Sequence, residues 1–194
     1  IDITAMDDSD EIDLKQLQVR LPNGTPLVSA ERFGIKAHER TLVTGPSGAG
    51  KSTLFRAIAG IWPFGSGSIA IPLNAKLMML PQRPYFPIGS LKAAIAYPAE
   101  SGEFSVQQVA EAVTAVGLPA LTSRLDEEAH WNGILSLGEQ QRLGMARVLL
   151  HRPDYLFLDE ATASLDEPSE AALYRLIEEK LPATTVVSIG HRST

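Results

Sequence analysis

A phosphate-binding pattern constrains this chain more than any other feature of its sequence. Eight consecutive residues fit G-x-x-x-x-G-K-[ST], and they are Gly45-Pro46-Ser47-Gly48-Ala49-Gly50-Lys51-Ser52. A short apolar run, Arg40 to Gly45, precedes the pattern, and Ser52 to Gly60 has the apolar spacing of a helix that ends at a glycine. The order strand, glycine loop, helix predicts an α/β fold with a ligand loop between sheet and helix.

The chemistry of this loop points to a nucleotide. Glycines let the backbone turn tightly, so that successive N–H groups face phosphate oxygens, and the N-terminus of the following helix favours an anion. We expect Lys51 to reach the β- and γ-phosphates of ATP and the Ser52 hydroxyl to bind Mg²⁺. Thr53 completes the predicted nucleotide-binding set. The pattern indicates a P-loop NTPase without specifying which kind.

A second apolar strand ends in two carboxylates. The run Tyr155-Leu156-Phe157-Leu158-Asp159-Glu160 places both acids at the C-terminal edge, where open α/β sheets bind their ligands. Asp159 suits the Mg²⁺ shell, and Glu160 suits a general base that polarises the attacking water. The pair therefore predicts hydrolysis of the γ-phosphate.

The remaining segments predict the organisation of the chain. Residues 1–11 are acidic without periodicity, which favours a flexible leader. Strands on either side of a turn at Pro22-Asn23-Gly24 indicate an antiparallel subdomain. Apolar strands that alternate with helices indicate a mainly parallel sheet, and helical spacing over about 87–150 predicts an inserted helical lobe. We expect a P-loop NTPase core of the α/β class over residues 12–194.

Composition excludes several classes of protein. A net charge of −6 and a pI near 5.2 argue against nucleic acid as a partner. The chain has no cysteine, so disulfides and thiolate metal sites are excluded. No apolar run approaches the roughly 18 residues of a membrane-spanning helix, so we expect a soluble domain.

Further motifs resemble those of ABC ATPases. The segment Leu135-Ser136-Leu137-Gly138-Glu139-Gln140-Gln141-Arg142 is similar to the family's signature segment. The chain also has Gln82 after a strand, Ala163-Ser164-Leu165-Asp166 after the acidic pair, and His191 after the last strand. The motifs follow one another in the family's order, and the resemblance covers the sequence from about Leu14 onward. It implies the ABC ATPase fold.

The resemblance also implies a role for each motif. Ser136 and the Gly138 N–H would contact the γ-phosphate held by a second copy of the domain, and Asp166 would lie at the interface of this head-to-tail homodimer. Gln82 would touch Mg²⁺ or the water, and His191 would bind the γ-phosphate and position Glu160. The implied catalytic residues are Glu160, His191 and Gln82, and the implied metal ligands are Ser52, Gln82 and Asp159.

The sequence of these motifs and of the segments around them resembles one branch of the family. This branch comprises the bacterial transporters related to subfamily D fatty-acyl transporters and to BacA-like peptide importers. Two departures from the family pattern stand out. Leu137 and Glu139 replace a glycine and a glutamine of the signature, and we assign no phosphate contact to Glu139 because like charges repel. Leu21 stands where the family often stacks adenine on an aromatic ring, which predicts weak discrimination among purines.

The function that follows is the ATPase motor of a membrane transporter, at the cytoplasmic face of a membrane, most simply a bacterial inner membrane. Its partner would be a transmembrane domain of the same parent chain, which we expect to precede this segment. Pro- and aromatic-rich residues 82–97 are the predicted contact surface, with Tyr85 and Phe86 as coupling residues.

The alternative is a soluble ABC ATPase that acts on DNA or ribosomes. A third possibility, a regulatory domain that binds nucleotide without hydrolysis, is disfavoured by Glu160, Gln82 and His191.

Overall fold

The computed structural model describes residues 1–46, 48–100 and 102–190, and its contacts divide them into two units. The sheet unit consists of Ile1–Met79, Pro153–Asp159 and the described residues from Ala183 onward. The helical unit consists of Leu80–Arg152 and Glu160–Pro182. Each unit has its own packed interior, and each is described by itself below.

A mainly antiparallel layer forms one part of the sheet unit. Its strand order is β1-β5-β2-β3, and the strands are β1 (Asp2–Met6), β2 (Glu11–Arg20), β3 (Pro26–Lys36) and β5 (Gly65–Pro72). In β2 the buried residues change from even to odd positions after Leu14, and the backbone of Gln16 has a φ of 48° at that point. The bulge at Gln16 therefore keeps Leu17 and Val19 on the buried face. The predicted turn after β2 joins it to β3 as expected.

The first residues differ from the expected flexible leader. Asp2 to Met6 form β1, which pairs in parallel with β5 from Ser68 to Pro72. The strand has almost no buried side chain, so its sequence carries no alternating apolar pattern. Backbone pairing with an existing strand edge holds this segment.

A parallel sheet forms the other part of the sheet unit. The strand order is β4-β10-β9-β6, with β4 (Arg40–Val43), β10 (Thr185–Ile189), β9 (Tyr155–Asp159) and β6 (Leu77–Pro81). Strands β4 and β9 both pair in parallel with the central β10. Four consecutive residues of β9, from Tyr155 to Leu158, are buried, as expected of a strand covered on both faces.

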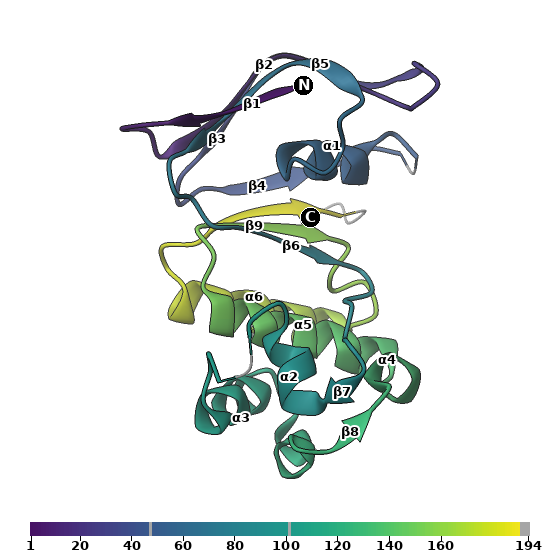
Figure 1. Ribbon diagram of the computed structural model, residues 1–194, viewed down its shortest axis with the longest axis vertical. Helices are drawn as coiled ribbons and strands as arrows, with labels where there is room; N and C mark the ends of the chain where they lie inside the picture. The colour runs from purple at the N-terminus through teal and green to yellow at the C-terminus, as the bar shows by residue number, and fades with distance from the viewer. Residues whose placement is uncertain (47, 101, 191–194) are drawn as a thin grey trace. The chain divides into compact units, whose positions relative to one another are not determined.

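Helix α1 (Lys51–Ile58) lies between the two sheets (Figure 1). Phe55 packs edge-to-face on Phe157 of β9 with ring centroids 5.0 Å apart, and Ile58 joins the same cluster. The cluster also includes apolar residues of β2, such as Leu14, and of β10, such as Val187. This shared interior fixes the helix that begins directly after the glycine loop.

The helical unit is built around one buried helix, α5, and Figure 1 shows it among shorter elements. Helix α5 spans Leu137–His151, and the other elements of the unit are β7 (Gly89–Ser90), α2 (Leu91–Ala96), α3 (Val106–Ala115), the 3₁₀ helix η1 (Pro119–Arg124), β8 (Glu128–Ala129), α4 (Trp131–Ile134) and α6 (Glu167–Lys180). Ser90, Ser105, Ser136 and Asp166 each cap a helix with a side-chain oxygen. The unit is wider than the predicted lobe of 87–150, because it begins at Leu80 and includes α6.

Candidate functional site

The glycine loop of the sheet unit connects β4 to α1, as the pattern predicts. Gly50 occupies the N-cap of α1 with a φ of 91°, in the left-handed region. A Cβ at this position would lie 3.0 Å from Val28 Cγ2 and 3.1 Å from Leu27 Cβ, so β3 leaves no room for a side chain. Backbone conformation and packing both require glycine here. Ser47 lies outside the described residues.

Lys51 folds back over this loop. Its Nζ donates hydrogen bonds to the carbonyl oxygens of Gly45 and of Pro46, the latter at 3.0 Å. Because Gly50 has no side chain to cap α1, the first N–H groups of the helix remain available for an anion. A cationic ammonium beside uncapped N–H groups fits a polyphosphate, and Ser52 and Thr53 lie in the first turn of the same helix.

Strand register places Asp159, the predicted metal ligand, at the same edge as the loop. Ile189 of β10 is paired with Val43 of β4 on one side and with Asp159 of β9 on the other. These strands are parallel, so their carboxyl ends meet at one edge, and the glycine loop begins two residues after Val43. The sheet unit therefore brings together the phosphate loop and Asp159. His191 lies outside the described residues.

Glu160 follows Asp159 with an unusual backbone. Its φ is 52°, a left-handed conformation that costs a non-glycine residue about 1–3 kcal/mol. The Glu160 carbonyl accepts a hydrogen bond from the Ala163 N–H at 3.1 Å, which starts a compact turn that continues to Leu165. Strain of this kind is concentrated at functional sites.

The signature segment forms the N-terminus of α5 in the helical unit. The Ser136 hydroxyl accepts a hydrogen bond from the Glu139 N–H at 3.2 Å, and the Glu139 carboxylate accepts one from the Ser136 N–H at 2.9 Å. This capping box explains the acidic residue in the signature, because the Glu139 carboxylate is bonded to backbone. A Cβ on Gly138 would make only ordinary contacts, 3.6 Å from Leu165 and 3.8 Å from Ser164, so packing within the chain does not itself require glycine.

Two further predicted residues belong to the helical unit. Gln82 is exposed, and its carbonyl oxygen accepts a hydrogen bond from Gln141 Nε2 at 3.0 Å. Asp166 is the N-cap of α6 and accepts a hydrogen bond from the Ser169 N–H at 2.8 Å. The hydroxyl and N–H of Ser169 lower the pKa of the Asp166 carboxyl, so this residue is an anion at neutral pH.

A buried arginine, which the sequence interpretation missed, holds the segment after Gln82. Arg147 of α5 is 6% exposed and donates hydrogen bonds to the carbonyl oxygens of Tyr85 (2.8 Å), Ala94 (2.7 Å) and Ile95 (3.3 Å). Its guanidinium carbon lies 4.8 Å from the centre of the Phe86 ring. Burial lowers the pKa of Arg147 to about 10, so it stays protonated at neutral pH.

The same segment corrects one expectation. Tyr85 is 61% exposed and can contact a partner, but Phe86 is 1% exposed beneath the Arg147 guanidinium. The predicted coupling role of Phe86 is therefore wrong as a surface contact, since its ring belongs to the interior of the helical unit. Ile88 is 77% exposed and Tyr97 39% exposed, so they extend the apolar surface beside Tyr85.

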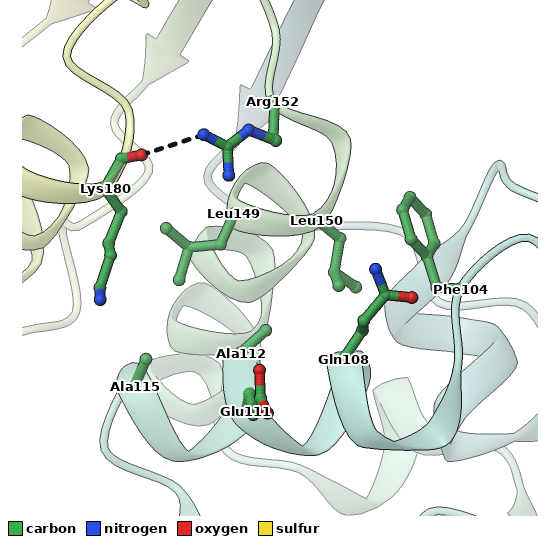
Figure 2. Close-up of a pocket in the computed structure, with 9 residues that line it drawn as sticks. All are labelled: Phe104, Gln108, Glu111, Ala112, Ala115, Leu149, Leu150, Arg152 and Lys180. Carbon is green, nitrogen blue, oxygen red and sulfur yellow. Dashed lines mark hydrogen bonds between the residues drawn. The ribbon is translucent and has the colours of Figure 1, made fainter.

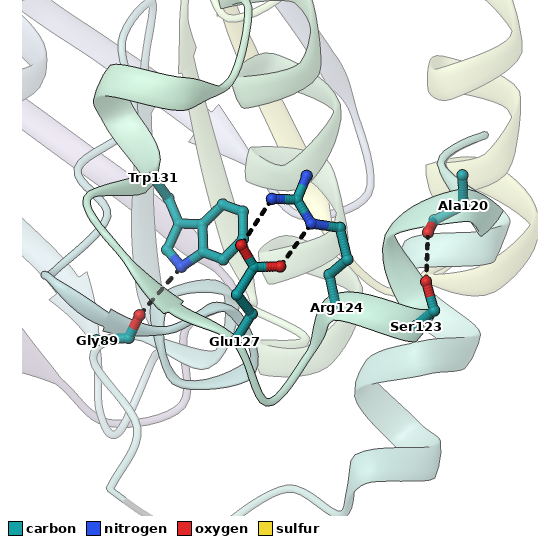
Figure 3. Close-up of polar contacts among 6 residues, drawn as sticks. All are labelled: Gly89, Ala120, Ser123, Arg124, Glu127 and Trp131. Atoms are coloured by element: carbon teal, nitrogen blue, oxygen red, sulfur yellow. Dashed lines mark hydrogen bonds and ion pairs between the residues drawn. The ribbon is translucent and has the colours of Figure 1, made fainter.

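The loop before the signature is fixed by an ion pair and an indole (Figure 3). Arg124 donates two hydrogen bonds to Glu127, at 2.7 and 2.8 Å, and its guanidinium carbon lies 5.0 Å from the Trp131 ring centre. Trp131 is fully buried, and its indole N–H donates to the Gly89 carbonyl at 3.0 Å. The hydrogen bond from Arg124 lowers the pKa of Glu127. The indole, rather than the exposed ion pair, ties this loop to β7.

A cavity of 440 Å³ lies elsewhere in the helical unit (Figure 2). Its lining combines apolar and charged side chains from α3 and from the C-terminal parts of α5 and α6: Phe104, Gln108, Glu111, Ala112, Ala115, Leu149, Leu150, Arg152 and Lys180. Arg152 donates a hydrogen bond to the Lys180 carbonyl at 3.3 Å. Among the residues that the structure describes, none that is predicted to bind nucleotide lines this cavity.

Comparison with known proteins identifies the family. The sequence profile of the ABC transporter family matches residues 29–163. An uncharacterized ABC transporter ATP-binding protein of Haemophilus influenzae is 44% identical over 184 residues, which cover 95% of this chain and 31% of the relative. ABC transporter D family member 1 of Arabidopsis thaliana is 34% identical over 203 residues, covering 96% of this chain and 15% of the relative.

A solved structure gives the same result. The structure of a bacterial Atm1-family ABC exporter with ATP bound aligns with a TM-score of 0.84 and 25% identity, covering 98% of this chain and 36% of the exporter chain. The chain belongs to the ABC transporter family, with the fold of its ATP-binding domain, and the predicted fold class is confirmed. The chain spans less than a third of the length of three of the curated relatives it matches. Within the part of the chain that the structure describes, no helix is long and apolar enough to cross a bilayer.

We expect weak selectivity for the purine base, with dissociation constants for ATP and GTP within about tenfold of each other. Leu21, directly after β2, offers no ring for stacking. The nearby Phe64, whose carbonyl accepts a hydrogen bond from the Arg20 N–H, is 41% exposed. Neither an aliphatic contact nor a stacked ring makes hydrogen bonds to the edge of a purine, so neither distinguishes adenine from guanine. Calorimetric titration measures both constants, and ATP binding more than about tenfold tighter than GTP binding would contradict the expectation.

Proposed function

We propose that this chain binds Mg-ATP on its phosphate loop and hydrolyses it in a head-to-tail dimer that powers a membrane transporter. One observation carries the proposal: Val43, Ile189 and Asp159 share one register, so the phosphate loop and the acidic strand end meet at one edge of a parallel sheet. This arrangement is what phosphoryl transfer needs, since catalysis there consists largely of positioning and charge neutralisation.

The residues of this edge have separate tasks. Lys51 exchanges its bonds to the loop carbonyls for the β- and γ-phosphates, and the uncapped N–H groups of α1 bind phosphate oxygens. Ser52, Asp159 and Gln82 are the proposed Mg²⁺ ligands, and the ion would neutralise charge on the phosphates. Glu160 accepts the proton of the attacking water, and its fixed backbone supports that task. His191 is proposed to bind the γ-phosphate.

The second half of each site comes from a partner copy in this proposal. Ser136 is exposed at the N-terminus of α5, a position that favours an anion, and Gly138 adds no side chain that would obstruct an approaching phosphate. Asp166 is the proposed interface residue. The likeness to a bacterial Atm1-family ABC exporter solved with ATP bound supports ATP binding by this domain, and the dimer is proposed from the motifs.

The transport role rests on the relatives. They include D family transporters and a bacterial exporter, each much longer than this chain, so a transmembrane domain of the same parent protein is the proposed second partner. The exposed surface around Tyr85 and Ile88 is proposed as its contact, and the domain is proposed to lie at the cytoplasmic face of a membrane. A soluble ABC ATPase acting on DNA or ribosomes is not favoured, because the named relatives are transporters.

The mass of the Glu160→Gln protein in solution, with and without Mg-ATP, tests the proposal. We expect a monomer without nucleotide and a dimer with it, because the variant binds ATP and fails to release the partner by hydrolysis. The double variant Lys51→Ala, Glu160→Gln is the matched control and should remain a monomer. A Glu160→Gln protein that binds ATP and stays monomeric would overturn the head-to-tail mechanism.

A further inference from the structure

A single buried amide joins three segments of the helical unit. Gln141, in the second turn of α5, has no exposed surface. Its Nε2 donates a hydrogen bond to the Gln82 carbonyl at 3.0 Å, and its Oε1 accepts one from the Ser164 N–H at 2.9 Å. The amide thus connects α5 to the segment after β6 and to the turn that follows Glu160.

The two bonds fix the orientation of this amide. Only the nitrogen can donate to a carbonyl, and only the oxygen can accept from an N–H, so a flipped amide would lose both bonds. A buried group with both ends used is rigid and expensive to disturb, because each lost bond leaves a buried partner without compensation. Gln141 therefore sets the separation between the Gln82 carbonyl and the Ser164 N–H.

Each connected segment carries a residue of the proposed site. Gln82 bears the side chain proposed for Mg²⁺ or water, and Ser164 stands two residues before Asp166 in the turn that begins at Glu160. Helix α5 itself begins at the signature residue Ser136.

A neighbouring pair of amides holds the same helix to the Gln82 segment only. Asn132 accepts from the Phe86 N–H at 2.9 Å and donates to the Pro84 carbonyl at 2.9 Å and to Gln140 at 3.0 Å. Gln140 in turn donates to the Leu135 carbonyl at 2.9 Å. Gln140 is buried like Gln141, but its described hydrogen bonds go to Asn132 and Leu135 and not to the turn at Ser164. The two adjacent glutamines therefore differ in the segments that they connect.

We propose that Gln141 is a positioning residue that makes the Gln82 segment, the signature helix and the turn at Ser164 move as one piece. The inference rests on the proposed function, since it concerns how one copy presents Asp166 and Ser136 to another. Without the Gln141 amide, the turn that carries Asp166 loses its place relative to the signature. Dimerisation should then weaken while nucleotide binding to each copy is largely retained, because the two hydrogen bonds of the Gln141 amide go to backbone groups of Gln82 and Ser164 and leave the Gln82 side chain unengaged.

Gln141→Leu tests the proposal, with Gln140→Leu as the matched buried control. In the Glu160→Gln background, Gln141→Leu should raise the ATP concentration for half-maximal dimerisation about tenfold, with monomer affinity for ATP changed less than about twofold. Amide hydrogen exchange at Ser164 should become about tenfold faster without nucleotide in Gln141→Leu, and it should stay unchanged in Gln140→Leu.

Exchange at Ser164 that is unchanged in Gln141→Leu would overturn the proposal, and so would equal acceleration in both variants, which would show general loosening of α5. If Gln141→Leu does not fold, Gln141→Glu keeps the acceptor for Ser164 and loses the donor to Gln82. Exchange should then remain slow at Ser164, whereas fast exchange there would contradict the proposal. The exchange measurement needs no dimer, so its outcome stands even if the Glu160→Gln protein fails to dimerise and the proposed function is wrong.

Discussion

The Glu160→Gln protein is expected to hydrolyse ATP about a thousandfold more slowly than the unmodified chain, because an amide cannot take the proton of the attacking water. The left-handed backbone at Glu160 is compatible with glutamine as it is with glutamate, since the two side chains branch identically. The change is nearly isosteric, so affinity for ATP should change less than about threefold. Release of inorganic phosphate from purified protein measures the rate, and nucleotide titration measures the affinity.

Two control variants distinguish loss of the general base from other causes of slow hydrolysis. Glu179→Gln makes the same change on an exposed face of α6 and should leave the rate unaltered. Asp159→Asn should also slow hydrolysis, but its rate should recover partly at high Mg²⁺ concentration, since the residue is proposed to bind the metal. A Glu160→Gln protein with at least a tenth of the normal rate would refute the assignment of Glu160 as the base.

Arg147→Ala is expected to reduce the free energy of unfolding of the helical unit by about 3 kcal/mol. The substitution leaves the carbonyls of Tyr85, Ala94 and Ile95 without their buried donor and opens a cavity beside Phe86. The pKa of Arg147, about 10, lies below its ordinary value of 12.5, so burial of the charge itself costs stability at every pH below about 10. The hydrogen bonds and ring contacts offset that cost.

Urea denaturation followed by tryptophan fluorescence measures this loss, because Trp131 is buried in the same unit. Arg175→Ala, an exposed arginine on α6, is the matched control and should change stability by less than about 0.5 kcal/mol. Arg147→Met removes the charge and keeps most of the volume, so it should cost about half as much as alanine. Equal stability of Arg147→Ala and the unmodified chain would contradict the role of Arg147 as the anchor of residues 85–95.

Local patterns carried most of what could be predicted. The glycine loop between β4 and α1 and the acidic end of β9 were predictable, because a motif and its flanking periodicity specify both chemistry and context. The parallel register that brings Asp159 to the loop edge then follows from alternation of buried strands and helices. The capping box was also present in the sequence, since Ser136 and Glu139 have its spacing, and it would have explained the acidic signature residue.

Contacts between distant segments were not predictable. Gln141 and Arg147 bond to backbone groups far away in the chain, and the sequence does not specify which carbonyl a buried donor will meet. Strand β1 was missed because its side chains are exposed, so only pairing with β5 defines it. Phe86 was misassigned because an aromatic residue beside prolines looks the same in sequence whether its ring lies on the surface or under an arginine.

The capping of α5 has a consequence for what Ser136 can offer a visiting molecule. A serine hydroxyl has lone pairs to receive hydrogen bonds and a single proton to give. The Glu139 N–H takes up one of these lone pairs, and the proton remains to be given. The residue is thereby suited as a donor to oxygen atoms that bear negative charge. Substitution by threonine preserves both the cap and the donor, whereas alanine removes them together.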